Sequence, residues 1–351
     1  MPRNTVTTPR QAMHGFSLIE LMIAITVSLL VLAGLTTIYV SNSQTRNEIE
    51  RANRMTENGR YAMEQLLHDL RNAGYYAEFD PTVLASPAAE PDPCATALAN
   101  LRSALPVPVQ GYDNGSGGLA CISDVRADTD VLVVRRASTC AVGDANCDAV
   151  VAGAPYIQAS LCGAATELTA PDVNEYYRLD TTIANLDRHE RDCTTIADYQ
   201  RYYTRIYFVA NNDKAGDGIP TLKVAELGAG GFTIIPLVEG IENLQLEYGL
   251  DTDATPDGAP NVFTTDPGSY NACDPTTVPT CVGNWQSAVS VKVNLLARNL
   301  DNSPGHTDNK TYTLGLNDDG TANTAGPFSD AIKRHAYQSV VRLNNLAGRR
   351  M

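Results

Sequence analysis

The feature that most constrains this chain is an apolar run near its start, "GFSLIELMIAITVSLLVLAGLTTIYV", from Gly15 to Val40. From Leu21 to Val40 this run contains no charged residue. As a helix that part would be about 30 Å long, which matches the hydrocarbon core of a bilayer. One carboxylate, Glu20, stands almost at the start of the run. Because a lone carboxylate in lipid is costly, we expect Glu20 to have a partner or a function.

The residues before the apolar run form a short basic segment. Residues 1–15 contain Arg3 and Arg10 but no acid, and positive charge at this place keeps that end of a chain in the cytoplasm. A secretory signal peptide carries its small cleavage-site residue after the apolar core, whereas here Gly15 precedes it. We therefore predict that residues 1–15 are a leader, and that cleavage after Gly15 would leave the apolar segment on the mature protein.

Cleavage after Gly15 would supply Glu20 with a partner. It would create a free ammonium on Phe16, and Glu20 would lie near the N-terminus of the helix, where negative charge is favoured. The carboxylate can pair with this ammonium in its own chain or in a neighbouring chain, and pairing with a neighbour would set the axial register of stacked helices. The alternative is a signal anchor or an ordinary single-span helix, which leaves Glu20 unexplained.

The helix is predicted to extend over 16–74, with about 19–40 spanning the membrane. Beyond the membrane, apolar residues at helical spacing form one stripe. Its members are Ile49, Ala52, Met55, Gly59, Ala62, Met63, Leu66, Leu67, Leu70 and Ala73. The sequence Asn72-Ala73-Gly74 is a typical C-terminal stop. The first half of the helix should thus be buried in lipid or among other helices, and the stripe should lie against the chain's own globular domain, residues 75–351.

The globular part shows the two-residue period of β-strands. Leu244, Leu246, Tyr248 and Leu250 alternate on one face, as do Val289, Val291, Val293 and Leu295. Further strands are predicted at 130–136, 203–210, 221–227, 311–316 and 337–343, with turn signals at Asp217-Gly218, Asp257-Gly258 and Asp319-Gly320. Strands that follow one long striped helix predict an α+β fold, in which an antiparallel sheet packs on the helix.

Eight cysteines all lie after residue 90: Cys94, Cys121, Cys140, Cys147, Cys162, Cys193, Cys273 and Cys281. An even number behind an export-like start indicates disulfides in an oxidising compartment. Zinc sites need close pairs such as C-x2-C, which the sequence lacks. Pairing of nearest neighbours, 94 with 121, 140 with 147, 162 with 193 and 273 with 281, is our hypothesis. Residues 80–120, rich in Pro and Ala, are predicted to be a disulfide-tied loop region rather than a second domain.

No cofactor, catalytic or metal site is predicted, and nucleic acid is an unsuitable partner. The net charge is -14, whereas phosphate binding needs a surplus of Lys and Arg. His189 and Cys193 in "DRHERDC" are residue types of a Cys-His hydrolase, but a solvated loop is the simpler interpretation. The stretches 211–218 and 251–258 are rich in side-chain oxygens. Because neither matches the calcium-loop pattern of an EF-hand, we predict hairpin turns there.

The segment "GFSLIELMIAITVSLLVLAG" resembles the processing and assembly segment of type IV prepilins and related pseudopilins. In that family a prepilin peptidase cuts between Gly and Phe and methylates the new terminus, and a Glu five residues into the mature chain supports filament assembly. Gly15, Phe16 and Glu20 match this pattern position for position. The resemblance implies a structural subunit that is not an enzyme.

Later segments resemble the PilW-type minor pilins, namely "MEQLLHDLRNAGYYAEFD", "DTDVLVVRRA", "PLVEGIENLQLEYGLD", "VKVNLLARN" and "AYQSVVRLNN". The chain departs from the family in being much longer than a typical major pilin. Two cysteine-bearing stretches, about 94–121 and 140–193, also have no counterpart.

This resemblance implies a single-pass inner-membrane protein with a cytoplasmic leader and a periplasmic ectodomain, which then enters the pilus at or near its tip and helps to start assembly. Its implied partners are other minor and major pilins, the prepilin peptidase, the inner-membrane assembly machinery and a tip adhesin. Two alternatives are a type II secretion pseudopilin and a membrane-anchored periplasmic adhesin that never polymerises. A strain that lacks the protein should lose secretion if the protein is a secretion pseudopilin, and twitching motility if it is a pilus subunit.

Overall fold

A computed structural model describes residues 15–115, 118–273, 281–317 and 319–350. The α-helices are α1 (Leu18–Asn72), α2 (Leu98–Ser103), α3 (Cys281–Gln286) and α4 (Asn344–Arg349). The short 3-10 helices are η1 (Pro81–Val83), η2 (Val173–Tyr176), η3 (Ile183–Asn185) and η4 (Tyr270–Ala272). The strands are β1 (Val109–Tyr112), β2 (Val131–Ala137), β3 (Tyr156–Ala159), β4 (Tyr177–Asp180), β5 (Tyr199–Ala210), β6 (Thr221–Gly228), β7 (Gly231–Glu239), β8 (Ile241–Leu250), β9 (Val262–Thr264), β10 (Ala288–Arg298), β11 (Tyr312–Leu316), β12 (Ala322–Ala325) and β13 (Arg334–Arg342).

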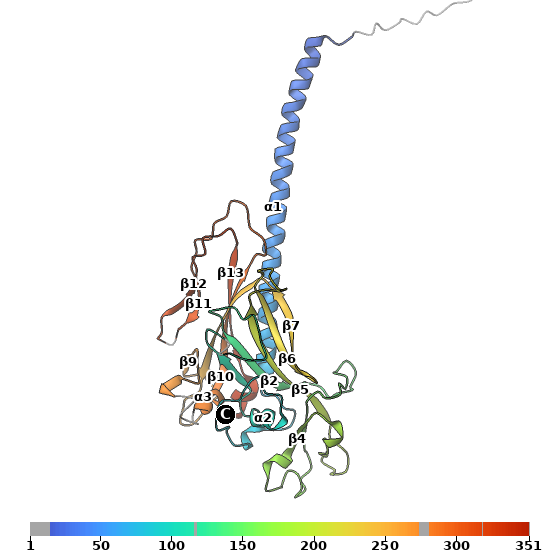
Figure 1. The fold of residues 1–351 in the computed structure, drawn as a ribbon, viewed down its shortest axis with the longest axis vertical. Helices are drawn as coiled ribbons and strands as arrows, with labels where there is room; N and C mark the ends of the chain where they lie inside the picture. The colour runs from blue at the N-terminus through green and yellow to red at the C-terminus, as the bar shows by residue number, and fades with distance from the viewer. Residues whose placement is uncertain (1–14, 116–117, 274–280, 318, 351) are drawn as a thin grey trace, which may run out of the picture. The chain divides into compact units, whose positions relative to one another are not determined.

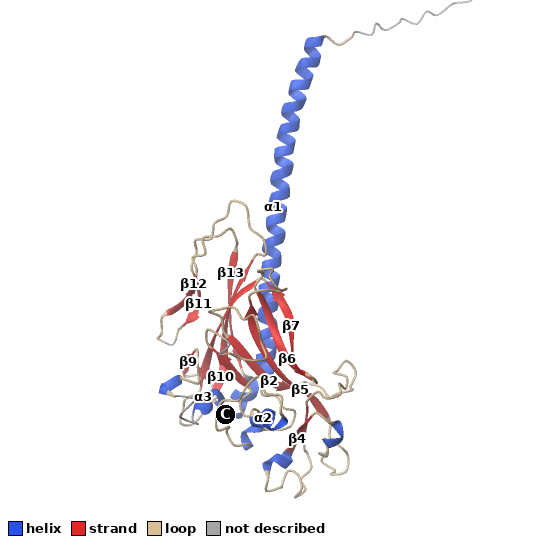
Figure 2. Ribbon diagram, viewed as in Figure 1, coloured by secondary structure: helices blue, strands red, loops and turns tan. Residues whose placement is uncertain are grey.

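The long helix α1 belongs to two compact units, the first ending at Arg51 and the second beginning at Ala52. The helix ends where its C-terminal stop was predicted. Gly74 adopts a positive φ of 72°, the left-handed conformation that commonly follows a helix C-terminus. All strands follow α1 in the chain (Figure 2).

The strands form two large sheets and a hairpin, and every pairing between strands is antiparallel. The seven-stranded sheet runs β1-β2-β5-β6-β7, with β3 and β4 joined to the start of β5. The four-stranded sheet has the order β13-β10-β8-β9, and β11 pairs with β12 alone. The expected α+β fold with an antiparallel sheet is therefore confirmed, with two main sheets in place of one.

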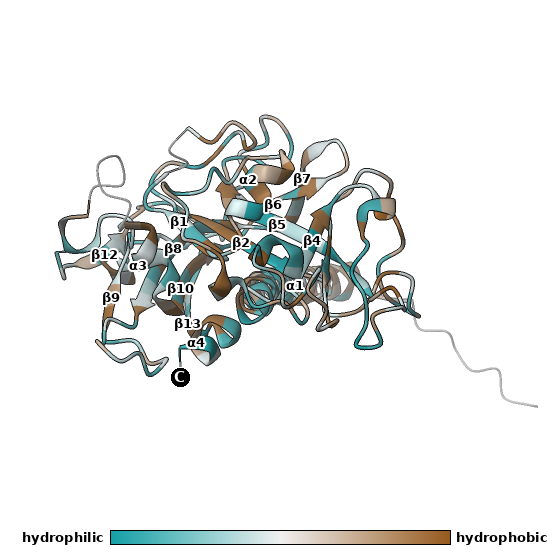
Figure 3. Cartoon of the chain, turned by 90° about the horizontal axis from the view of Figure 1, so that it is seen from below, coloured by the Kyte–Doolittle hydropathy of each residue, from teal (hydrophilic) through white to brown (hydrophobic). Residues whose placement is uncertain are grey.

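The main core lies where the second half of α1 meets both sheets (Figure 1). The helix contributes Ala62, Met63, Leu66, Leu67, Leu70 and Ala73 to this core. The seven-stranded sheet contributes residues such as Leu132 and Tyr207, and the four-stranded sheet residues such as Leu246 and Val293. In the view along α1, α4 and β13 lie on one side of the helix, and β2 and β5 on another (Figure 3). One helix stripe thus joins two sheets into a single core.

The predicted apolar stripe of α1 is confirmed from Met55 to Ala73, where its residues are buried or pack against the core. Met55 packs against the core and Gly59 is buried, but Ile49 is 55% exposed. The predicted alternation in β10 is interrupted at one point. A bulge between Ala288 and Ser290 shifts the pattern, so that Ala288 joins the core face in place of Val289.

Strand β7 was not predicted from the sequence. Its "GFTIIPLVE" lacks alternation and contains Pro236, which cannot donate a ladder hydrogen bond. The structure accommodates this proline because β7 is an edge strand that pairs with β6 alone. A register shift between Leu222 and Lys223 of β6 lies beside it. The short strands β1, β3, β4, β9 and β12 were also not predicted.

Candidate functional site

The predicted processing site lies just before α1. Residues 1–14 of the predicted leader lie outside the described residues. Gly15, Phe16 and Ser17 precede the helix in non-helical conformation, and Phe16 is 91% exposed. In the first unit, nothing lies within 4 Å of the position that a Cβ on Gly15 would take. Gly15 and Phe16, the two residues of the predicted cleavage site, are thus both exposed.

Glu20 has a hydrogen-bond partner in its own chain. The backbone N–H of Ser17 donates to Glu20 Oε2 at 2.9 Å, and the N–H of Ile19 makes a longer contact of 3.4 Å to Ser17 Oγ. This is a variant of the capping box, in which a Ser and a Glu three residues later satisfy free N–H groups at a helix start; here Ser17 Oγ accepts from Ile19 rather than from Glu20. The sequence carries the S-x-x-E pattern that signals such a box, but Ser17 was not among the predicted site residues. Ser17 is therefore a contact of Glu20 that the sequence pattern could have indicated.

The capping box leaves half of the carboxylate available. Among the described residues, no donor contacts the other oxygen, Glu20 Oε1. The negative charge in the first turn also meets the positive end of the helix dipole, which stabilises it. Glu20 can thus cap its own helix and accept a hydrogen bond from a second group.

The side chains that follow Glu20 are apolar and exposed. Every residue from Leu21 to Val40 is exposed, and α1 is, in the described part of the chain, the helix with the length and composition to cross a membrane. Soluble proteins seldom expose an apolar surface of this extent. An exposed apolar segment of this length is consistent with burial in lipid or among the helices of other chains.

A buried acid, Asp69, fixes the second half of α1 on the seven-stranded sheet. Asp69 is 1% exposed and forms ion pairs with Arg136 of β2 at 2.8 Å and Arg205 of β5 at 3.0 Å. The hydroxyl of Tyr207 donates to the same carboxylate at 2.6 Å. Burial alone would raise the pKa of Asp69, but the two arginine charges and the Tyr207 hydrogen bond outweigh it and lower the pKa. Asp69 lies beside Leu66 and Leu70 of the apolar stripe. A carboxylate at this place in the sequence could have indicated a buried acid with a partner.

The eight cysteines form four disulfides. The bonds are Cys94–Cys121, Cys140–Cys147, Cys162–Cys193 and Cys273–Cys281, the same pairs as in our nearest-neighbour hypothesis. They close loops within the second unit and leave no free cysteine among the described residues. This pattern is typical of a domain exposed to an oxidising compartment.

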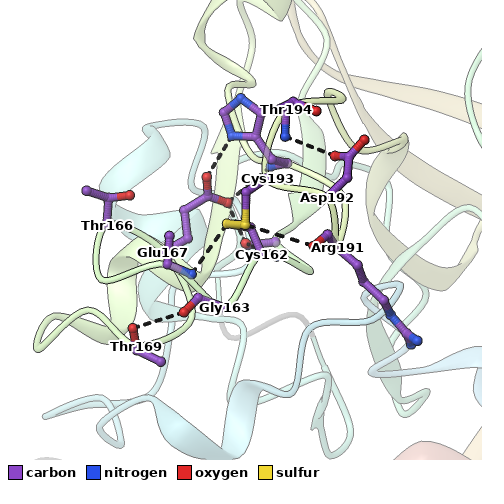
Figure 4. Close-up of a disulfide and its surroundings, with 12 residues drawn as sticks. Cys162, Gly163, Thr166, Glu167, Thr169, Arg191, Asp192, Cys193 and Thr194 are labelled. Carbon is purple, nitrogen blue, oxygen red and sulfur yellow. Dashed lines mark hydrogen bonds and ion pairs between the residues drawn. A yellow bond between two sulfur atoms is a disulfide. The ribbon is translucent and has the colours of Figure 1, made fainter.

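The Cys162–Cys193 disulfide excludes a thiol nucleophile at the one place where the sequence offered Cys and His together (Figure 4). His189 Nδ1 lies 2.7 Å from Glu167 Oε1, and Ser160 donates to the other oxygen of Glu167. Burial would raise the pKa of Glu167, but the hydrogen bonds from Ser160 and His189 outweigh it and lower the pKa. The cluster is a polar bridge that holds the disulfide-tied loops together.

Both oxygen-rich stretches form turns. In 211–218, the carboxylate of Asp217 accepts backbone N–H groups of Asp213 and Lys214. In 251–258, buried Asp251 accepts the N–H of Gly258 at 2.9 Å and contacts Arg350 at 3.4 Å. The carboxylates of Asp251, Asp253 and Asp257 lie within 4.8 Å of one another, and in the described residues they are the acidic group closest to a metal-site geometry.

Comparison with known proteins gives two family matches. Residues 206–345 match the type IV pilus-assembly protein W family, and residues 10–36 match the prokaryotic N-terminal methylation motif. Among solved structures, a type IV-like pilin from Thermus thermophilus has 12% sequence identity and a TM-score of 0.33, with 84% of this chain and 97% of that chain covered. No curated protein matches the chain.

The two matched regions correspond to the two parts of the molecule described above. The methylation motif covers Gly15, Phe16 and Glu20, and the other match begins in β5 and extends to α4. The matched families are structural and not enzymatic. The chain therefore carries a prokaryotic N-terminal methylation motif and a region that is similar to the type IV pilus-assembly protein W family.

Proposed function

We propose that this protein is a minor pilin of a type IV pilus, made as a prepilin and cut between Gly15 and Phe16. The observation that carries the proposal is the position of Glu20 in the first turn of a helix whose next twenty side chains are uncharged and exposed. Prepilin peptidase would cut the leader on the cytoplasmic side and methylate the amine of Phe16. The apolar half of α1 would span the inner membrane before it enters the pilus.

Glu20 would select the register of the helix in the assembly. Its Oε2 accepts the N–H of Ser17 in the same chain. Oε1 would then accept a hydrogen bond from the ammonium of Phe16 in a neighbouring pilin. A charged pair in an apolar environment is strong only when both partners are in contact. Helices that slide by one turn would separate the pair, and this cost would disfavour wrong registers.

The ectodomain supports a place at or near the pilus tip. Its strands and disulfide-tied loops make a domain much larger than that of a typical major pilin, and the match to type IV pilus-assembly protein W supports a role in assembly. In this proposal the protein is a low-abundance subunit that helps to initiate the pilus. Other minor and major pilins, the inner-membrane assembly machinery and a tip adhesin would be its partners.

Two measurements test the proposal. Mass spectrometry of the mature protein should find an N-terminus at Phe16 with one added methyl group. Glu20→Gln should still be cleaved and inserted but should be missing from sheared pili, because the neutral amide does not neutralise the ammonium charge in an apolar environment. Glu50→Gln is the matched control, since Glu50 is an exposed acid of the same helix. A mature chain that retains residues 1–15, or normal pilus entry of Glu20→Gln, would contradict the proposal.

A further inference from the structure

Arg201 in β5 is a buried arginine without an anionic partner in the described part of the chain. It is 8% exposed, and its Nε is buried with no hydrogen-bond acceptor. No described residue accepts a hydrogen bond from its guanidinium. Arginine is rarely this deeply buried unless it is paired, because an unpaired charge out of water is costly.

Two tyrosines hold the guanidinium of Arg201 in place. Its Cζ lies 5.8 Å from the ring centre of Tyr156 and 5.7 Å from that of Tyr203. Tyr156 is directly opposite Arg201 in the β3–β5 pairing, and Tyr203 is two residues along on the same face of β5. Such cation–π contacts orient the group, but they do not saturate its N–H donors. The guanidinium is thus preorganised with unused donors.

The same cluster shows what Arg201 lacks. Arg136 and Arg205 also approach the ring of Tyr203, at 5.2 Å and 4.5 Å from its centre. Both of them are ion-paired with Asp69. Three guanidiniums therefore share one tyrosine ring, and Arg201 is the one for which the described residues supply no carboxylate.

An exposed apolar loop lies next to this position. The hydroxyl of Tyr203 donates to Asp148 at 2.8 Å, and that of Tyr156 accepts the N–H of Val151 at 2.7 Å. The segment 149–153, "AVVAG", is exposed throughout, with Val150 at 51% and Val151 at 46%. The segment 149–153, which is bonded to Tyr156 and follows the Tyr203 partner Asp148, thus presents uncharged apolar side chains to solvent, in a chain whose net charge is -14.

We propose that Arg201 binds a carboxylate presented by an acidic side chain of a protein partner, whose neighbouring apolar residues contact Val150 and Val151. A carboxylate is planar and matches the fork of a guanidinium, with two parallel N–H···O bonds. The apolar loop beside the charge favours a polypeptide over a free ion. This surface does not include Glu20, so it can be tested without pilus assembly.

The first test measures carboxylate binding to the full-length protein in detergent micelles. The side-chain Nε–H signal of Arg201, assigned by its absence in Arg201→Lys, is followed by NMR while N-acetylaspartate methylamide is added. We expect a saturable shift with this probe and none with the neutral N-acetylasparagine methylamide. Arg191→Lys, which removes an exposed arginine, is the control and should leave the shift unchanged. No shift, or equal shifts with both probes, overturns the carboxylate site.

The second test concerns the source of the carboxylate. A photocross-linking residue replaces Val150 in cells that produce the full chain, with or without Arg201→Lys. We expect a cross-link to a protein, falling at least several-fold when Arg201 is lysine, while a cross-linker at exposed Ile196 gives the same yield in both chains. Absence of a protein cross-link at position 150, or an equal yield in both chains, overturns the partner surface. Equal thermal midpoints of the two chains would show that Arg201→Lys is folded.

Discussion

At the level of single residues, the buried acid Asp69 carries most of the specificity of the contact between α1 and the sheet. Apolar side chains such as Leu66 and Leu70 supply affinity, but they tolerate small shifts. The Asp69 carboxylate accepts from Arg136, Arg205 and Tyr207 together, and only one position of the helix satisfies all three. Polar groups with several fixed partners can therefore define a register that hydrophobic burial alone leaves loose.

We predict that Asp69→Asn lowers the stability of the second unit by about 3–5 kcal/mol, because it takes the anion from buried Arg136 and leaves half-buried Arg205 with Glu226 alone. Chemical denaturation followed by circular dichroism would measure this change. Asp144→Asn, at an exposed position without a side-chain ion pair in the described part of the chain, should have no measurable effect. Equal denaturation midpoints for Asp69→Asn and the unmodified chain would refute the role of the carboxylate.

The lowered pKa of Asp69 also predicts a pH dependence. Burial opposes ionisation, but Arg205, Arg136 and Tyr207 lower the pKa of Asp69 below its ordinary 3.8. The folded state therefore binds this proton less tightly than the unfolded state, and the ion pairs stabilise the fold fully above about pH 4. As pH falls through the folded pKa, this stabilisation is lost. The stability difference between the unmodified chain and Asp69→Asn should thus be constant near neutrality and shrink in acid.

At the level of elements, the second half of α1 approaches β13 closely at a glycine. A Cβ on Gly59 would overlap the ring of Tyr337, whose hydroxyl also lies 3.5 Å from the carbonyl oxygen of Thr56. Glycine in a helix interior normally costs about 1 kcal/mol relative to alanine. Here it permits the helix to lie against the four-stranded sheet.

We predict that Gly59→Ala destabilises the protein by about 1–3 kcal/mol, although alanine is the better helix former, because the added methyl group displaces Tyr337. Thermal unfolding should show a lower midpoint. Gly348→Ala in α4 is the control, since nothing lies within 4 Å of its added Cβ, and it should not lower the midpoint. The cost of Gly59→Ala should shrink in a Tyr337→Leu background, and an undiminished cost there would exclude this contact as the cause.

For the whole molecule, the four disulfides make stability dependent on the redox compartment. The Cys162–Cys193 bond closes a loop with a sequence separation of 31 residues, and the polar bridge of Glu167, His189 and Ser160 lies across the same loop. A loop of this size costs considerable entropy to close without a covalent link. Folding in a reducing cytoplasm should therefore give a less stable ectodomain than folding after export.

We predict that the double variant Cys162→Ser/Cys193→Ser loses about 3–4 kcal/mol of stability, the loop-closure entropy of a loop of this length. Denaturation midpoints before and after reduction would measure it. Reduction should also lower the stability of the double variant by less than that of the unmodified chain, since one bond is already absent. If the variant were as stable as the oxidised parent, the bond would be dispensable for the fold.

Several features of this protein are local enough to be read from consecutive residues. The apolar run that begins at Phe16 and the stop at Gly74 define α1, because helix formation depends on neighbours within a few turns. Alternation identified β8 and most of β10, and the disulfides join cysteines that are adjacent in the order of the sequence. The capping box of Ser17 and Glu20 was equally local.

Other features depend on contacts between residues far apart in the chain. Asp69 and Arg205 are 136 positions apart. Their ion pair cannot be predicted from the sequence, because it forms only when α1 packs on β5. Pro236 is compatible with β7 only because that strand lies at a sheet edge. Arg201 looks like an ordinary solvated arginine in the sequence, but in the fold it is 8% exposed and lies beside the rings of Tyr156 and Tyr203. Burial and pairing at such a distance are properties of the assembled core, which a periodic pattern does not encode.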